Sequence, residues 1–238
     1  MQLFNADCLS ILPTLPDKSI DLFICDLPYG CLHGSGSTNL NNPNYERYKT
    51  SIVNKGAAWD IKLDLAELWK QIERLAKNDN TPIIFFCTAR FGYELITSNP
   101  DWFRYDLILN KGMGVNYLSA GIRPMTSHEL IYVFGKKMPT YNKILIDGKC
   151  PLSVLQYKLK RDKRHPTAKQ IDLYKWLIER YSNTEDTVLD PTAGSFNSAR
   201  ACVQLNRRYI GIEKDEKFFT NNTADLISED TLNGTVHA

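Results

Sequence analysis

An aspartate at the end of an apolar segment is the first residue of this chain that is placed to do chemistry. In the stretch SIDLFICDLPYG, residues 19–30, the apolar side chains before Asp26 predict a buried strand, and the proline and glycine that follow prevent it from continuing. We therefore expect Asp26 at a strand end, on stiff backbone. A strand followed by an ordinary tight turn, with Tyr29 as a core aromatic, fits the same residues.

Two further acids stand at predicted strand ends near the C-terminus. In TVLDPTAGSFNSARACVQLNRRYIGIEKDE a strand ends at Asp190, Gly194 lets the backbone approach a ligand, and a helix starts near Ser195 with free N–H groups. Glu213 ends the next strand 23 residues after Asp190. A doubly wound fold presents an acid to ribose hydroxyls at an interval of about 20 residues, so a nucleoside ligand is indicated.

The residues of this turn indicate which kind of nucleoside ligand it could bind. A dinucleotide site carries the pattern G-x-G-x-x-G, whereas this turn has one glycine behind an aspartate and a proline. Asp190 would repel a pyrophosphate, but beside an ammonium group it gains a charge-assisted hydrogen bond. S-adenosylmethionine carries an ammonium group, a carboxylate and a ribose, so we expect it as the cofactor.

The elements that must position these acids alternate between strands and helices. Beyond a short strand and helical turn at the start, strands are predicted at 20–26, 81–88, 103–111, 128–134, 187–190 and 207–213, and helices at 64–77, 89–96, 165–181, 197–205 and 215–227. This order predicts an α/β doubly wound fold with a mostly parallel sheet. Residues 31–58 show no sustained period, and with Tyr45 and Tyr48 they form a candidate lid or DNA clamp.

Composition limits the class of protein. The chain has 238 residues, 43% of them hydrophobic, which is enough for one compact body. Its six cysteines include no Cys-x-x-Cys pair, so we expect free thiols and no metal site. No apolar run approaches the roughly 18 to 20 residues that cross a bilayer, and the N-terminus lacks a signal-peptide pattern. We expect a cytoplasmic protein with no membrane segment.

Charge is distributed unevenly along the chain. Residues 103–165 hold 12 Lys and Arg against 4 Asp and Glu, while the remainder holds 17 against 23. A basic segment in an acidic body is typical of a surface that binds a polyanion, although a solvated lysine-rich connector gives the same pattern. The better candidates for phosphate contacts are Lys111, Arg123, Lys136 and Lys137.

Three motifs of the chain resemble those of the amino-group DNA methyltransferases of the beta arrangement, which modify adenine N6 or cytosine N4. The motifs are DLPYG, HPTAKQIDLYKWLI and VLDPTAGSFNSARACVQLNRRYIGIEKDEKFF. That family typically shows Asp-Pro-Pro-Tyr, then His-Pro-Thr-x-Lys-Pro, then Asp-Pro-Phe-x-Gly-Ser-Gly-Thr. Here the motifs follow in the family order, and the resemblance covers about residues 2–220.

The resemblance implies a Rossmann-like methyltransferase sheet with an inserted target-recognition region. The expected divisions are a catalytic half at 1–112, the target-recognition insertion at 113–164, a cofactor-binding half at 165–228 and a tail at 229–238. The implied partner is double-stranded DNA. A homodimer is implied by the resemblance alone.

The chain departs from the family pattern at four positions. Leu27 replaces the first proline of the catalytic motif, Gln170 replaces the proline after Lys169, Thr192 replaces the usual phenylalanine, and Phe196 stands where a second glycine is common. The ring of Phe196 could restore an aromatic contact to the cofactor adenine from a different position. We interpret the chain as an active variant.

The resemblance also assigns the cofactor-binding residues. His165, Thr167 and Lys169 close over the methionine end, where Thr167 and Lys169 supply donors for the carboxylate. Asp7 faces the exocyclic amine of adenine. A helix N-terminus around His165 and a simple cap at Asp7 are the structural alternatives. The whole expected set is Asp7, Cys8, His165, Thr167, Lys169, Asp190, Pro191, Gly194, Ser195, Phe196 and Glu213.

The catalytic motif Asp26, Leu27, Pro28 and Tyr29 suits methyl transfer to a conjugated amino group. The Asp26 carboxylate and the Leu27 carbonyl can each accept one amino hydrogen, which turns the nitrogen lone pair outward and stabilises the developing positive charge. Pro28 stiffens the backbone, and Tyr29 can stack on the base. Because the amino group is inaccessible in a duplex, the nucleotide must be flipped out of the stack.

Several substrates are compatible with this motif. Asp26 at its first position favours adenine, whereas relatives that act on cytosine N4 more often have serine there. An RNA or a protein glutamine amide presents a comparable amino group to Asn-Pro-Pro-Tyr relatives, although Asp26 and the late cofactor motif disfavour that reading. A catalytically silent DNA-binding homologue remains a further alternative, because the PTAGSF turn is altered.

Overall fold

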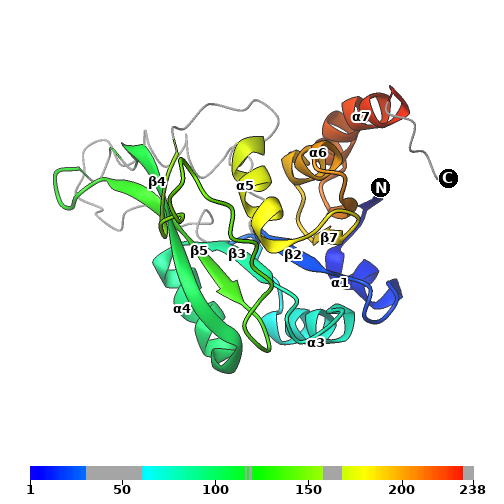
Figure 1. Ribbon diagram of the computed structural model, residues 1–238, viewed down its shortest axis with the longest axis horizontal. Coiled ribbons are helices and arrows are strands. Elements are labelled where there is room, and N and C mark those ends of the chain that lie inside the picture. The colour runs from blue at the N-terminus through cyan, green and yellow to red at the C-terminus, as the bar shows by residue number, and fades with distance from the viewer. Residues whose placement is uncertain (31–60, 116, 118–119, 158–167, 233–238) are drawn as a thin grey trace, which may run out of the picture.

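The computed structural model describes residues 1–30, 61–115, 117, 120–157 and 168–232. They form one eight-stranded sheet with the order β1-β8-β7-β2-β3-β5-β4-β6, covered by helices (Figure 1). The strands are β1 (Gln2–Asn5), β2 (Leu22–Cys25), β3 (Ile83–Cys87), β4 (Phe103–Val115), β5 (Thr126–Phe134), β6 (Val154–Gln156), β7 (Thr187–Asp190) and β8 (Arg208–Glu213).

The sheet is parallel from β1 to β3 and then changes direction. Strands β1, β8, β7, β2 and β3 pair in parallel, β5 is antiparallel to both β3 and β4, and β6 is parallel to β4. The predicted doubly wound α/β fold with a mostly parallel sheet is confirmed.

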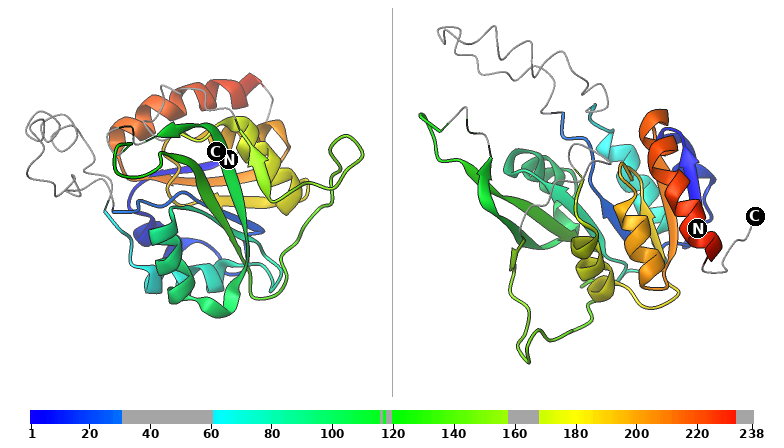
Figure 2. Two further views of the ribbon diagram at one scale, coloured as in Figure 1. Left: turned by 90° about the vertical axis from the view of Figure 1, so that its left-hand side faces the viewer. Right: turned by 90° about the horizontal axis from the view of Figure 1, so that it is seen from above.

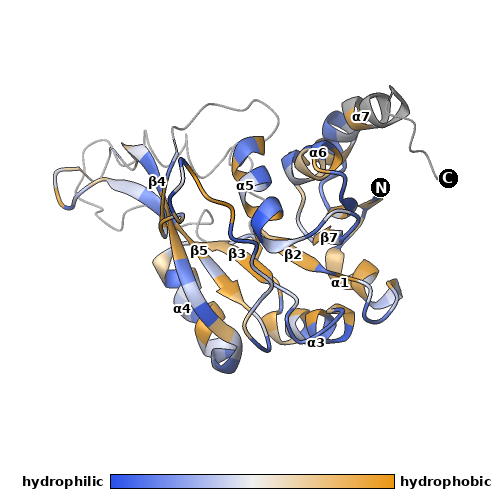
Figure 3. Ribbon diagram, viewed as in Figure 1, coloured by the Kyte–Doolittle hydropathy of each residue, from blue (hydrophilic) through white to orange (hydrophobic). Residues whose placement is uncertain are grey.

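Two apolar cores lie on the two faces of the sheet. The buried side chains of β2 alternate between them: Leu22 and Ile24 face one core, and Phe23 and Cys25 face the other. This alternation follows from the period of two in a strand. Because both faces are covered, β2 reads as a continuous apolar run (Figure 3).

The helices divide between the two cores. Helices α5 (Ile171–Tyr181), α6 (Asn197–Gln204) and α7 (Glu216–Leu232) contribute to the first core, and α1 (Cys8–Ile11), α3 (Leu65–Leu75) and α4 (Ala89–Ser98) contribute to the second. Figure 3 shows α3 with one apolar and one polar side. Its N-cap is Asp64, whose carboxylate accepts hydrogen bonds from the amides of Ala66 and Glu67.

Two of the predicted boundaries fall within elements of the structure. Strand β5, which belongs to the predicted insertion at 113–164, lies in the sheet between β3 and β4. The tail predicted from residue 229 begins within α7, which continues to Leu232. Among the described residues, no helix is both long and apolar enough to cross a membrane.

The hairpin of β4 and β5 extends beyond the neighbouring strands. Strand β4 was predicted at 103–111 and continues to Val115, which pairs with Thr126 at the start of β5. Cys87, the last residue of β3, pairs with Leu130, so residues 111–115 of β4 and 126–129 of β5 project past the edge at which β2 and β3 end (Figure 2).

Candidate active site

Parallel pairing brings the catalytic and cofactor motifs to one edge of the sheet. Strands β2 and β7 are neighbours with Phe23 opposite Leu189, so Asp26 and Asp190 leave the sheet side by side. Thr192 then joins the two motifs directly, because its hydroxyl donates a hydrogen bond to the backbone carbonyl of Asp26 at 3.1 Å.

The Asp26 carboxylate has a partner on each oxygen. The Tyr29 hydroxyl donates to Oδ1 at 2.9 Å, and the Lys169 ammonium donates to Oδ2 at 2.8 Å. The Tyr29 ring also packs against Phe91, with ring centroids 5.2 Å apart. Burial and the neighbouring carboxylate of Asp26 raise the pKa of Tyr29 well above its usual value, so its hydroxyl stays protonated and remains a donor.

A half-buried glutamate on β5 completes this cluster and was missed by the sequence analysis. Glu129 Oε2 lies 3.4 Å from Lys169 Nζ, and Oε1 pairs with Lys111. Burial alone would raise the pKa of Glu129, but the two lysines hold it below the usual value. The available signal was an acidic side chain near the start of an otherwise apolar strand, HELIYVF.

Lys169 is the centre of the cluster. Its side chain is only 9% exposed, and burial by itself would lower its pKa. The carboxylates of Asp26 and Glu129 outweigh that effect and raise the pKa, so Lys169 stays a cation. Asn197 at the start of α6 donates to the Lys169 carbonyl at 2.8 Å, which ties this lysine to the cofactor turn.

The cofactor turn is organised around two buried acids. Asp190 Oδ2 accepts a hydrogen bond from the Ser198 hydroxyl at 2.6 Å, and Oδ1 accepts one from the Thr192 amide at 3.1 Å. Glu213 Oε2 accepts one from the Gly194 amide at 2.8 Å. The predicted cofactor residues Asp190, Gly194 and Glu213 therefore lie together, with Pro191 and Ser195 buried in the same turn.

The electrostatics of Asp190 suit a cationic ligand. Burial raises its pKa to about 7, against the opposing effect of the Ser198 hydrogen bond. A carboxylate that is expensive to ionise in isolation gains most from an ammonium group placed beside it. The acid pair, with burial also raising the pKa of Glu213, therefore fits the ammonium and ribose groups of S-adenosylmethionine.

Phe196 begins α6 with a left-handed backbone, at φ 55°. Its ring is completely buried in the first core and packs against Phe219, with centroids 5.8 Å apart. The left-handed conformation explains why a glycine suits this position in relatives. The full burial favours a core role for the ring over the contact with adenine.

Asp7 and Cys8 lie at the same edge, beside Glu213. Strand β1 pairs with β8, and the Ala6 amide donates to the Glu213 carbonyl at 3.1 Å. The Asp7 carboxylate caps α1 through the Leu9 amide and pairs with Lys214 at 2.9 Å, which lowers its pKa. Cys8 is buried, and burial raises the pKa of its thiol to about 12.

Three parts of the predicted site cannot be placed. His165, Thr167 and the segment 31–58 lie outside the described residues. Within the described ranges, no group of three or more His, Cys, Asp or Glu side chains is arranged to hold a metal ion.

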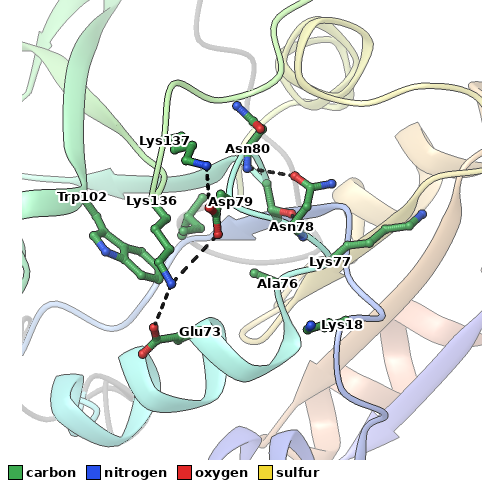
Figure 4. Close-up of a pocket in the computed structure, with 12 residues that line it drawn as sticks. Lys18, Glu73, Ala76, Lys77, Asn78, Asp79, Asn80, Trp102, Lys136 and Lys137 are labelled. Carbon is green, nitrogen blue, oxygen red and sulfur yellow. Dashed lines mark hydrogen bonds and ion pairs between the residues drawn. The ribbon is translucent and has the colours of Figure 1, made fainter.

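Lys136 and Lys137 lie at the opposite edge of the sheet from Asp26. They follow β5, whose last residue Phe134 pairs with Ile83 at the start of β3. Both lysines line a hollow of about 500 Å³ and pair with acids, Lys137 with Asp79 at 2.9 Å and Lys136 with Glu73 at 3.5 Å (Figure 4). Because β5 runs antiparallel to β3, both lysines lie away from Asp26, and their contact with DNA phosphates stays a prediction.

The structure thus places the predicted catalytic motif beside the predicted cofactor turn in a doubly wound fold. The family model described as DNA methylase, of the N6 and N4 methyltransferase type, matches residues 20–224. The chain belongs to this family and is an S-adenosylmethionine-dependent DNA methyltransferase.

Individual relatives agree with this assignment. The Type II methyltransferase M.HinfI of Haemophilus influenzae is 27% identical over 246 residues, which cover 91% of this chain and 65% of M.HinfI. The crystal structure of the M1.HpyAVI–SAM complex has a TM-score of 0.67 at 22% identity and covers 94% of this chain and 98% of that one.

A cytosine-N4-specific enzyme has the same fold. The PvuII DNA methyltransferase reaches a TM-score of 0.70 at 14% identity, over 98% of this chain and 93% of that one. The fold is therefore shared between enzymes of different base specificity.

Proposed function

We propose that this chain transfers a methyl group to the N6 amino nitrogen of adenine in a specific sequence of double-stranded DNA, after flipping the base out of the helix. The observation that carries the proposal is the junction of Asp26 with the cofactor turn, made through Thr192 and Lys169. A base amino group that reaches Asp26 lies next to the turn that takes the cofactor.

In this proposal the catalytic motif holds the amino group. The carboxylate of Asp26 and the carbonyl of Leu27 accept its two hydrogens and stabilise positive charge on the nitrogen. A carboxylate has about four acceptor positions, so the Tyr29 and Lys169 partners leave room on Asp26 for the base. Tyr29 contacts the ring of the base and offsets part of the unstacking cost.

The other residues of the site bind the cofactor, which supplies the methyl group from its sulfonium. Asp190 faces the ammonium group, Glu213 the ribose hydroxyls and Asp7 the amine of the cofactor adenine. Thr167 and Lys169 supply donors for its carboxylate, beside His165. Cys8, Pro191, Gly194 and Ser195 shape the walls. Phe196 supports the turn from the core.

The test is incubation of the protein with S-adenosylmethionine and mixed-sequence duplex DNA, followed by mass spectrometry of the nucleosides. N6-methyladenine is the expected product. N4-methylcytosine would revise the base. The absence of both, with RNA and protein substrates tested in parallel and cofactor binding measured by calorimetry, would support the other substrates or a silent DNA-binding homologue.

A homodimeric state, which the family resemblance implies, and a cytoplasmic location are further parts of this proposal. In this proposal target recognition lies within residues 113–164, whose described part includes the projecting β4–β5 hairpin and the segment leading to β6.

A further inference from the structure

Two of the four departures from the family pattern meet in space. The Thr192 hydroxyl donates to the carbonyl of Asp26, which belongs to the peptide group that joins Asp26 to Leu27. A phenylalanine at position 192 would have no hydroxyl to donate, and a proline at position 27 would restrain this peptide by itself. At this peptide the chain therefore lacks the restraint of a proline ring and has instead the hydrogen bond from the Thr192 hydroxyl.

The geometry of this peptide controls both acceptors of the catalytic motif. Rotation of the peptide group moves the Asp26 side chain relative to the Leu27 carbonyl. A proline would fix φ of residue 27 near −65°, whereas leucine leaves it free. Pro28 restricts Leu27 to extended ψ, which leaves φ as the remaining soft angle.

Thr192 itself is held firmly enough to act as a restraint. Its amide donates to Asp190 Oδ1 at 3.1 Å, so the residue is anchored at the end of β7. Leu27 packs in the second core with 3% of its surface exposed, which holds its side chain but leaves the orientation of its peptide to other contacts.

We propose that Thr192 is a positioning residue that replaces the missing proline and fixes the Asp26–Leu27 peptide for methyl transfer. This inference rests on the proposed role of the catalytic motif. It assigns to Thr192 an effect on the chemical step rather than on cofactor binding, although the residue lies in the cofactor turn.

A double-mutant cycle tests the inference. Thr192→Val removes the hydroxyl at nearly constant shape. We expect the single-turnover rate of methyl transfer to fall about three- to tenfold, because one hydrogen bond that positions the peptide is lost. The dissociation constant of S-adenosylmethionine should stay nearly unchanged. In the L27P background the same substitution should have little effect, because the proline then restrains the peptide. Thr192→Ser keeps the hydroxyl and is the matched control.

Each outcome has a distinct meaning. Equal rate losses in the wild-type and L27P backgrounds, or an unchanged rate in Thr192→Val, would overturn the inference while leaving the methyltransferase activity established. A loss confined to cofactor affinity would also overturn it. If L27P does not fold, as judged by thermal unfolding, the comparison of the valine and serine variants decides. Failure of the wild type to methylate any DNA base would remove the proposed function, and the inference with it.

Discussion

Asp26 illustrates how a half-buried carboxylate can be paired with other side chains and still be available to a ligand. Burying a lone carboxylate is costly, and here Lys169 and Tyr29 each satisfy one oxygen. Lys169 also pairs with Glu129, so the two carboxylates share its positive charge. The cluster contains two lysines, Lys111 and Lys169, and two acids, Glu129 and Asp26, so its charges balance.

We expect Asp26 to act in methyl transfer and Glu213 to act in cofactor binding, so that substitution of each acid affects a different step. Asp26→Ala should lower the rate of methyl transfer by about 10²-fold or more, because it removes the electrostatic stabilisation of the amino nitrogen, with cofactor affinity nearly intact. Glu213→Ala should weaken cofactor binding, since it removes the ribose acceptor and releases the Gly194 amide. Calorimetry and single-turnover assays check the pair, and equal loss of cofactor binding in both variants would refute the assignment.

The ion pairs of Glu129 lead to a prediction about the stability of the fold and its dependence on pH. Its pKa is lowered in the folded protein, so its ion pairs stabilise the fold above the usual glutamate pKa of 4.5, and this contribution is lost as the pH falls below that value. Glu129→Gln should lower the free energy of unfolding by about 1 to 3 kcal/mol at neutral pH, because Lys169 and Lys111 lose a half-buried partner. The difference from the wild type should shrink in acid.

Urea unfolding at several pH values checks this expectation. Glu73→Gln is the matched control, because the Glu73 side chain is 61% exposed and its pair with Lys136 lies at the surface. An exposed pair contributes about 0 to 1 kcal/mol, so the control should change little. A Glu129 variant as stable as the control at neutral pH would show that the cluster does not support the fold.

At the scale of the element, the start of α6 combines a strained backbone with a core side chain. Phe196→Ala and Phe196→Gly should both destabilise the protein by about 3 to 5 kcal/mol through the lost ring, less any relief of strain. The glycine variant should be the more stable of the two by about 1 kcal/mol, because only glycine adopts φ 55° without strain. Urea unfolding measures the difference, and equal stabilities would contradict the strain.

The same variants separate the two roles of the Phe196 ring. A ring that packs only in the core leaves the dissociation constant of S-adenosylmethionine nearly unchanged in the folded variants. A ring that covers the cofactor adenine adds about 0.5 to 1.5 kcal/mol, and its loss would raise the constant several-fold. The complete burial of the ring leads us to expect the first result.

At the scale of the whole molecule, the two edges of the sheet differ in what they offer DNA. Arg123 is exposed in the hairpin that projects past the Asp26 edge, whereas Lys136 and Lys137 lie at the other edge in pairs with acids. A duplex that delivers a base to Asp26 approaches the first edge. The basic middle segment of the sequence is therefore divided between two sides of the fold.

This division predicts different salt dependences of DNA binding. Arg123→Ala should reduce the log–log slope of affinity against salt by about 0.9, the release of counterions from one phosphate contact. The double variant Lys136→Ala and Lys137→Ala removes two positive charges instead of one, should give a line parallel to that of the wild type and serves as the control. Salt titrations on duplex DNA with cofactor present measure these slopes. A flatter slope in the double variant would show that Lys136 and Lys137 do contact DNA phosphates.

The sequence by itself determined the parts of this protein that are encoded locally. The apolar run before Asp26 predicted a buried strand, and the turn after Asp190 predicted a helix start near Ser195. Hydrophobic period and turn residues act within a few positions, so a single segment carries the whole signal. The family motifs added the order of the two functional regions.

Only the tertiary structure decided which distant side chains meet Asp26. Glu129 and Lys136 belong to one predicted basic segment, but the antiparallel direction of β5 brings the first to the active-site edge and carries the second away from it. The hydroxyl of Thr192 reaches the Asp26 carbonyl because β7 pairs with β2 in parallel. A period-two pattern is the same in either strand direction, so strand order and direction arise only when the sheet assembles.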